Sequence, residues 1–164
     1  MTDQVFGEMT YDCGWCGSVE WPFGGKACQI SLLVDGQEED AIEEGQRESY
    51  LRFMEQWPEL EALMLDALLD YYNSEERFSY GPDPKEQPEE YALWWPEIQT
   101  RQAMLEAIEP EVMVIPRNDW EDGNRRVYLL FGRSWGGEDL DDNGVAVAFL
   151  NEQIDGIGYK DIAF

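Results

Sequence analysis

An acidic run between residues 135 and 144 contains the residue types and spacing closest to those of a known chemical site. Asp139, Asp141, Asn143 and Gly144 match positions 1, 3, 5 and 6 of a calcium-binding EF-hand loop. The match then fails, because position 12, where a bidentate glutamate is expected, is Leu150. The flanking segments also favour strands rather than helices. We therefore interpret residues 138–144 as a turn whose Asp and Asn side chains cap their own backbone, and we predict no metal and no other cofactor.

The same carboxylates leave an alternative open, a divalent-metal-binding protein or a carboxylate-based hydrolase. Four of them could hold Mg²⁺ for phosphoryl chemistry: Glu138, Asp139, Asp141 and Asp142. The sequence shows no glycine-rich phosphate loop, no G-x-S-x-G motif and no evident glycosidase pair. It also contains no histidine, which is the commonest general base and metal ligand. We therefore predict a protein that is not an enzyme and has no catalytic residues.

Two of the seven tryptophans occur in acidic, turn-rich segments, Trp120 in N-D-W-E-D-G and Trp135 in S-W-G-G-E-D. Most tryptophans are expected in the core, because they are usually highly buried. An aromatic anchor surrounded by carboxylates would, however, suit a basic partner, since the ring packs and the acids attract charge. Our candidate partner-binding residues are Trp120, Trp135, Glu138, Asp139, Asp141 and Asp142.

Cys13 and Cys16 form a C-x-x-C motif, and Cys28 stands alone. A zinc site would need a second cysteine pair or two histidines. A thioredoxin-like centre would place the motif at the start of a helix, whereas glycines and a proline follow it here. We predict buried or half-buried structural thiols, and whether Cys13 and Cys16 ever pair stays open.

The charge of the chain is strongly one-sided, with 11 Lys and Arg against 36 Asp and Glu and a formal net charge of −25. Such a surplus repels nucleic-acid phosphates and anionic membrane surfaces, so we predict neither as a direct partner. It attracts a basic protein and speeds the encounter. The alternative is a structural or accessory domain whose acidity serves only solubility. The N-terminal residues lack the pattern of a signal peptide and no apolar run reaches membrane-spanning length, so we expect a cytoplasmic protein.

The hydrophobic pattern predicts one α+β domain over residues 1–164, with N-terminal strands in 1–36, helices in 41–108 and C-terminal strands in 111–164. Strands are expected at 5–11, 15–21, 27–34, 112–115, 126–131, 145–150 and 153–159. The strand at 112–115 lies between two prolines, which favours an edge or terminal position. Gly24-Gly25 is typical of a hairpin turn.

Helices are expected at 42–57, from Pro58 to about Tyr72, and at 96–108, with a surface loop over 73–90. Gln46 lies on the apolar side of the first helix, which predicts a buried amide bonded to nearby backbone. Strands, then helices, then strands indicate a mainly antiparallel sheet with about three helices packed on one face.

Three C-terminal motifs resemble the end of an uncharacterised bacterial domain family: V-Y-L-L-F-G-R-S-W, D-L-D-D-N-G-V-A-V-A-F-L and I-D-G-I-G-Y-K-D. Trp15-x-Gly17, I-S-L-L-V-D, Gln46 and Tyr71-Tyr72 fit the same layout. The family's turn carries Glu-His before its glycine, whereas Asp142-Asn143 stands here, so a role of that histidine does not carry over. Its members are similar to proteins encoded beside toxins, which implies an immunity-type binder. We therefore expect a non-enzymatic binding protein for a basic protein, such as a toxin; the oligomeric state stays open.

Overall fold

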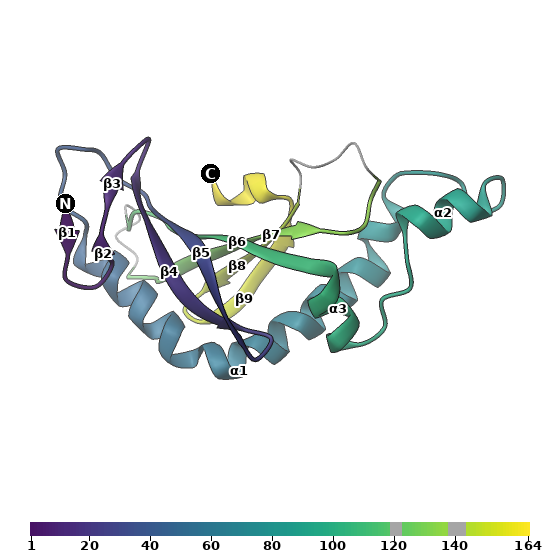
Figure 1. The fold of residues 1–164 in the computed structure, drawn as a ribbon, viewed down its shortest axis with the longest axis horizontal. Helices are drawn as coiled ribbons and strands as arrows, with labels where there is room; N and C mark the ends of the chain where they lie inside the picture. Colours follow the sequence, from purple (N-terminus) through teal and green to yellow (C-terminus); the bar gives the residue numbers. More distant parts are fainter. Residues whose placement is uncertain (119–122, 138–143) are drawn as a thin grey trace.

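The computed structural model describes residues 1–118, 123–137 and 144–164, and in them a long helix crosses one face of a seven-stranded sheet (Figure 1). The strands lie in the order β3 (Thr10–Tyr11), β4 (Trp15–Phe23), β5 (Lys26–Val34), β6 (Ile108–Ile115), β7 (Arg126–Arg133), β8 (Val145–Leu150) and β9 (Gln153–Gly158). Among the described strands only β5 and β6 pair in parallel. β1 (Thr2–Asp3) and β2 (Gly7–Glu8) form a separate small ribbon. The predicted α+β class, a mainly antiparallel sheet with helices, is confirmed.

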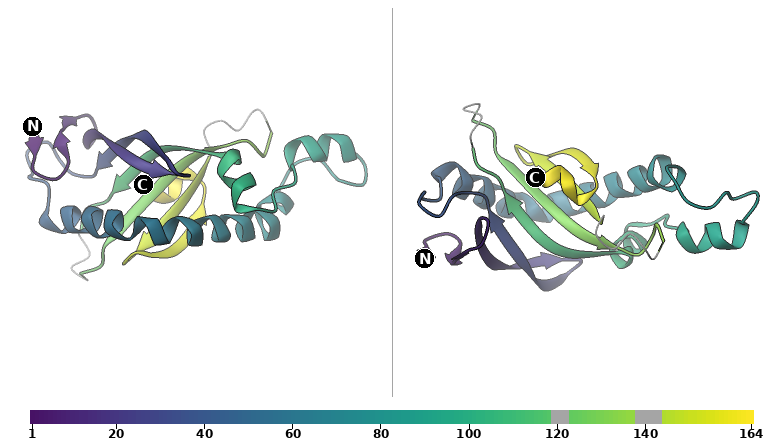
Figure 2. Two further views of the ribbon diagram at one scale, coloured as in Figure 1. Left: turned by 60° about the horizontal axis from the view of Figure 1, so that its bottom comes forward. Right: turned by 90° about the horizontal axis from the view of Figure 1, so that it is seen from above.

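The long helix α1 (Glu44–Ser74) supplies the core that covers one face of the sheet (Figure 2). Its buried side chains recur at helical spacing, and Trp57 packs on Trp21 of β4 with ring centroids 4.4 Å apart. The prediction of two helices divided at Pro58 was wrong. Pro58 lies on the exposed side of α1, while the stripe of buried side chains continues from Trp57 to Leu60. Burial on both sides of the proline therefore outweighs the backbone hydrogen bond that its missing N–H forfeits.

The start of α1 is fixed by Gln46, whose amide is buried as predicted. Its Nε2 donates to the backbone oxygens of Asp35 at 2.8 Å and Ile115 at 3.3 Å, and its Oε1 accepts from the backbone N–H of Glu43 at 3.0 Å. The side chain of Glu43 completes a capping box with this glutamine. One amide thus joins the helix to the ends of β5 and β6.

The segment predicted as a surface loop contains helical turns. η1 (Glu76–Phe78) follows α1 directly, and α2 (Pro88–Trp94) begins with a proline in its first turn. α2 projects beyond the sheet as an arm (Figures 1 and 2). The predicted helix at 96–108 is shorter, α3 (Arg101–Ala107), and Thr100 caps it by accepting from the backbone N–H of Ala103 at 3.1 Å.

The edge position predicted for the strand at 112–115 was wrong. β6 begins earlier, at Ile108, and lies between β5 and β7 in the middle of the sheet. Pro110 is tolerated there because the pairing with β7 shifts register between Pro110 and Val112. The predicted hairpin turn at Gly24-Gly25 is confirmed, with φ values of +60° and +76° that glycine adopts readily. Within the described ranges, no helix is long and apolar enough to cross a membrane.

Candidate partner-binding face

The face of the sheet opposite α1, which we call the open face, carries a second apolar cluster. Val114, Leu130 and Ala146 are buried there, and half-buried Leu33, Val112, Tyr128 and Ala163 pack against them. Among the described residues the cover is η2 (Lys160–Ala163), a short C-terminal helix that contacts β7 and β8. A four-residue helix is a small cover for a sheet of this width. Two of the pockets formed by the described residues are lined by this part of the sheet.

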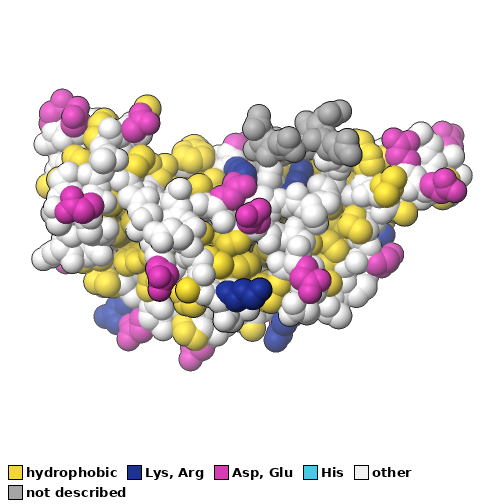
Figure 3. Space-filling view, viewed as in Figure 1, with side chains coloured by type: hydrophobic (Ala, Val, Ile, Leu, Met, Phe, Trp, Pro, Cys, Tyr) yellow, Lys and Arg dark blue, Asp and Glu magenta, His cyan; other side chains and the backbone are white. Residues whose placement is uncertain are grey.

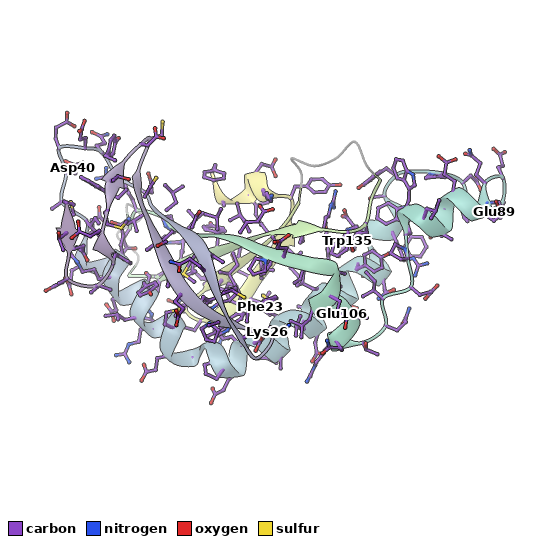
Figure 4. All side chains as sticks on the ribbon, viewed as in Figure 1. Phe23, Lys26, Asp40, Glu89, Glu106 and Trp135 are labelled. Carbon is purple, nitrogen blue, oxygen red and sulfur yellow. The ribbon has the colours of Figure 1, made fainter. Side chains whose placement is uncertain are left out.

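The first, which we call the acidic pocket, has a volume of about 420 Å³. Its carboxylates are the exposed side chains of Glu106 on α3 and of Glu109 and Glu111 on β6. Its remaining lining residues come mostly from β7 and the segment after it: Ala107, Ile108, Gly132, Arg133, Ser134, Trp135, Gly137 and Gly144. Figure 4 shows Glu106 on α3 near the end of the sheet where Trp135 also lies. The pocket therefore presents acids at its mouth over a floor of glycine and aromatic residues.

Lys160, the first residue of η2, joins that helix to the acidic pocket. Its Nζ forms a close ion pair with Glu111. The lysine stem passes over Gly144, where a Cβ would collide with it and with the backbone oxygen of Phe131. A glycine is needed there for space and also for its φ of +44°.

The second pocket, which we call the apolar pocket, has a volume of about 640 Å³. It is lined by the open-face residues Leu33, Val114, Pro116, Tyr128, Ile162, Ala163 and Phe164. Asp12, Cys13, Asp35 and Arg117 complete it at the rim. Ile162 and Phe164 are 38% and 82% exposed, which leaves apolar surface in contact with water. A contact surface with an apolar floor and a charged rim has the composition of a protein interface.

Below the acidic pocket lies a buried polar network that the sequence pattern did not reveal. The side chains of Arg133 and Glu76 are 4% and 2% exposed and form a close ion pair. Tyr71 donates its hydroxyl to Glu76 at 2.6 Å, and Arg133 Nη2 donates to the hydroxyl of Tyr80 at 3.1 Å. Burial, followed by the hydrogen bond to Glu76, raises the pKa of Tyr71 above its ordinary value, so its hydroxyl stays a donor. The network fastens the end of α1 to β7 beneath the pocket.

Nothing in the local sequence separates Glu76 from the other acidic residues. It lies in E-E-R-F, within the stretch predicted as a surface loop, and 36 acidic residues occur in the chain. Its burial depends on Arg133, which is 57 residues away. Only the fold brings the two together.

Of the predicted partner-binding residues, the structure describes Trp135, and it is 2% exposed. Its ring packs on Tyr72 with centroids 5.0 Å apart, and the Arg133 guanidinium lies 5.9 Å from its ring centroid. This position suits a core residue rather than an exposed anchor. Trp120, Glu138, Asp139, Asp141 and Asp142 lie outside the described residues, so their binding role stays a prediction. Gly137 and Gly144, which stand directly before and after residues 138–143 in the sequence, both line the acidic pocket.

The cysteines lie on strands and in a turn, as the glycines and the proline after the C-x-x-C motif indicate. Cys13 is in the turn between β3 and β4 with φ +59°, and Cys16 is on β4. All three thiols are free. Cys16 and Cys28 are half-buried as predicted, whereas the prediction was wrong for Cys13, which is exposed in the turn between β3 and β4. Within residues 1–118, 123–137 and 144–164, no group of three or more His, Cys, Asp or Glu could hold a metal ion.

Most of the basic side chains form ion pairs with carboxylates of the same chain. All eleven lie in the described ranges, and at least eight form an ion pair with a carboxylate: Arg47, Arg52, Arg77, Arg101, Arg117, Arg125, Arg133 and Lys160. Carboxylates spread over the surface in Figure 3, while Lys and Arg form no patch on that face. Figure 4 places Asp40 at one end of the molecule and Glu89 at the tip of the arm. Carboxylates therefore occur at both ends of the molecule.

Comparison with protein families gives one match over nearly the whole chain. The model of a domain of unknown function, DUF6985, matches residues 5–164. Neither the curated proteins nor the solved structures give a match.

Proposed function

The chain belongs to the DUF6985 family, whose function is unknown, and we propose from its own side chains that it is a non-enzymatic binding protein for a basic protein partner. The partner would lie on the open face, with a cationic side chain in the acidic pocket. An immunity protein that neutralises a basic toxin is the specific form of this proposal. The candidate residues of the acidic run at 138–142 adjoin this pocket in sequence and belong to the same proposal.

The observation that carries the proposal is that most basic side chains already pair with carboxylates of the same chain. At least eight of the eleven basic side chains are paired with the chain's own carboxylates, and the total formal charge is still −25. On the face shown in Figure 3, an anionic partner would meet no basic patch of the kind that phosphate recognition uses. A cationic partner would be steered by the whole field, which raises association rates by roughly 10–10³-fold at low salt.

The acidic pocket is the place where a single cationic side chain of the partner could bind. Among the residues that the structure describes, Glu106 and Glu109 form no ion pair, in contrast to Glu111, which is held by Lys160. A lysine or arginine entering between them would gain about 4 kcal/mol of Coulomb energy per carboxylate at 4 Å with an effective dielectric constant near 20, before desolvation. Desolvation and lost side-chain freedom offset much of this gain, so the pocket contributes specificity more than bulk affinity.

A pull-down from the native host at about 0.15 M salt, with matched variants as bait, tests the proposal. Wild type should recover a basic protein that the double variant Glu106→Gln/Glu109→Gln retains poorly. The control is Glu59→Gln/Asp70→Asn on α1, which removes the same formal charge from exposed positions of the helix. The association rate measured with the purified partner should fall as salt rises.

Three results would contradict the proposal. If wild type recovers no basic protein, the proposed partner does not exist. Equal loss of the partner from the pocket variant and the α1 variant would show that net charge alone is at work. Turnover of a substrate at an ordinary enzymatic rate would refute the non-enzymatic assignment.

A further inference from the structure

The apolar pocket is separate from the acidic pocket, and it has a composition of its own. Its floor is formed by Leu33, Val114 and Tyr128 of three adjacent strands, β5, β6 and β7, and its wall by Ile162 and Phe164. Its volume of about 640 Å³ falls within the roughly 300–1,000 Å³ of typical ligand pockets. It is large enough to hold one big apolar side chain with its neighbours along a polypeptide.

The rim of this pocket is acidic. Asp12 and Asp35 are exposed, and within the described part of the chain their carboxylates form no ion pair. The cation at the rim, Arg117, is paired with Asp40 at 3.1 Å and with Glu43 at 3.6 Å. The rim thus has the carboxylates of Asp12 and Asp35 beside a guanidinium that two other carboxylates already pair, so the charge at the rim is negative.

From this combination we infer that the apolar pocket is an anchor site for a short basic polypeptide segment that inserts one large apolar side chain between flanking lysines or arginines. The inference rests on the proposed function and names the chemistry of the partner at a second place on the same face. The apolar side chain would cover Leu33, Val114 and Tyr128, and the flanking cations would face Asp12 and Asp35. Such a segment matches the pocket in both polarity and charge.

Charge also decides against a second copy of this chain as the occupant. Two molecules of formal charge −25 repel each other, and a copy docking at an acidic rim would bring more carboxylates to it. A basic segment reverses the sign of that interaction. Aromatic residues and arginine are also the commonest binding hot spots at protein interfaces.

The test uses three acetylated and amidated peptides with a fluorescent label: KKWKK, KKGKK and EEWEE. Binding to the full chain is followed by fluorescence anisotropy and by amide NMR shifts. We expect KKWKK to bind roughly 30-fold more tightly than KKGKK, as for a hot-spot side chain, and EEWEE not to bind. The largest amide shifts should fall at Leu33, Val114, Tyr128 and Ala163.

Protein variants then separate the floor from the rim. Ile162→Ala/Phe164→Ala changes exposed lining residues and should reduce the preference for KKWKK over KKGKK, while the affinity for KKGKK changes little. Asp12→Asn/Asp35→Asn should weaken both lysine peptides, and the equally charged Glu59→Gln/Asp70→Asn should weaken them less.

The outcomes distinguish this inference from the proposed function. Equal binding of KKWKK and KKGKK, with both weakened by Glu106→Gln/Glu109→Gln, would refute the anchor and leave a basic partner in place. Equal binding of EEWEE and KKWKK would show an apolar site without charge selection, which also refutes the inference. Shifts confined to α2 or to the exposed side of α1 would overturn the location. No binding of either lysine peptide, together with no basic protein in the pull-down, would remove both proposals.

Discussion

Replacing Arg133 by methionine should be among the most destabilising single changes in this protein. Methionine has a similar length but no charge, so the substitution leaves Glu76 buried without its cation. The carboxylate would keep the hydroxyl of Tyr71 as a donor at 2.6 Å. One neutral hydrogen bond does not replace an ion pair for a carboxylate that is 2% exposed.

The magnitude follows from the burial of both partners. Breaking a buried ion pair by removing one member costs about 3–5 kcal/mol. In a domain of this size each kcal/mol lowers the melting temperature by roughly 2–4 °C, so Arg133→Met should lower it by about 6–20 °C. The double variant Glu76→Met/Arg133→Met removes both charges and should recover most of that loss, because no unpaired charge remains.

Urea unfolding followed by tryptophan fluorescence measures these differences in unfolding free energy. The matched control is Arg52→Met, because Arg52 pairs with Glu55 at 3.3 Å while both side chains are more than half exposed, at 55% and 67%. An exposed pair on a helix contributes about 0.3–0.5 kcal/mol, so this variant should unfold nearly as wild type does.

The reasoning is refuted if Arg133→Met costs no more than Arg52→Met. It is also refuted if the double variant is as unstable as the sum of its two single variants, because the two losses would then be independent. In either case the ion pair between η1 and β7 would not fasten the end of α1.

Three further predictions concern stability. Gln46→Leu should cost about 2–4 kcal/mol of unfolding free energy, because it leaves the backbone oxygen of Asp35 and the N–H of Glu43 without the glutamine and leaves the oxygen of Ile115 with only the N–H of Asp35, while exposed Gln56→Leu should cost under about 0.5 kcal/mol; urea unfolding compares them. Pro58→Ala should raise unfolding free energy by about 1–2 kcal/mol by restoring a helix hydrogen bond, and a lower melting temperature would contradict this. Although burial works to raise it, hydrogen bonds from Arg47 and backbone N–H groups lower the pKa of Asp3, so its contribution is present above the ordinary value of 3.8 and is lost as pH falls below it. The stability advantage of wild type over Asp3→Asn should therefore shrink in urea titrations between about pH 4 and pH 2, and a constant difference would contradict the linkage.

The sequence pattern succeeded where local chemistry decides the structure. The alternation of apolar residues located six of the seven predicted strands, and Gly24-Gly25 marked the hairpin turn. The strand predicted at 5–11 was wrong, because β2 and β3 are separate short strands that belong to different sheets. Gln46 is the sharpest case, because an amide on an apolar helical stripe must find partners, and it does. Each of these inferences needed only neighbouring residues.

Long-range contacts account for the wrong predictions. Pro58 normally marks a helix boundary, yet packing of α1 along the whole sheet keeps one helix through it. Pro110 normally indicates an edge strand, yet a register shift accommodates it in the middle of the sheet. In both cases burial in the folded protein outweighed the local conformational preference of a proline.

The residues that line the two pockets could be predicted from the sequence only in part. An acidic, turn-rich segment before Gly144 was identified, and that glycine lines the acidic pocket. The glutamates of the pocket come instead from α3 and β6, and the apolar pocket combines β5, β6, β7 and the C-terminal residues. These segments are distant in the chain, so their joint charge and polarity exist only in the folded sheet.

The open face separates the binding proposal from the alternative in which acidity serves only solubility. A surface selected for solubility alone would avoid exposed apolar groups, because these promote association. Here Ile162 and Phe164 remain exposed beside an apolar pocket, and the carboxylates of Asp12 and Asp35 at its rim form no ion pair with any residue that the structure describes. The acids would keep such a face from joining another copy of the same chain, while they leave it open to a cation-bearing partner. Apolar exposure and negative charge at one place are therefore better explained by selective binding than by solubility.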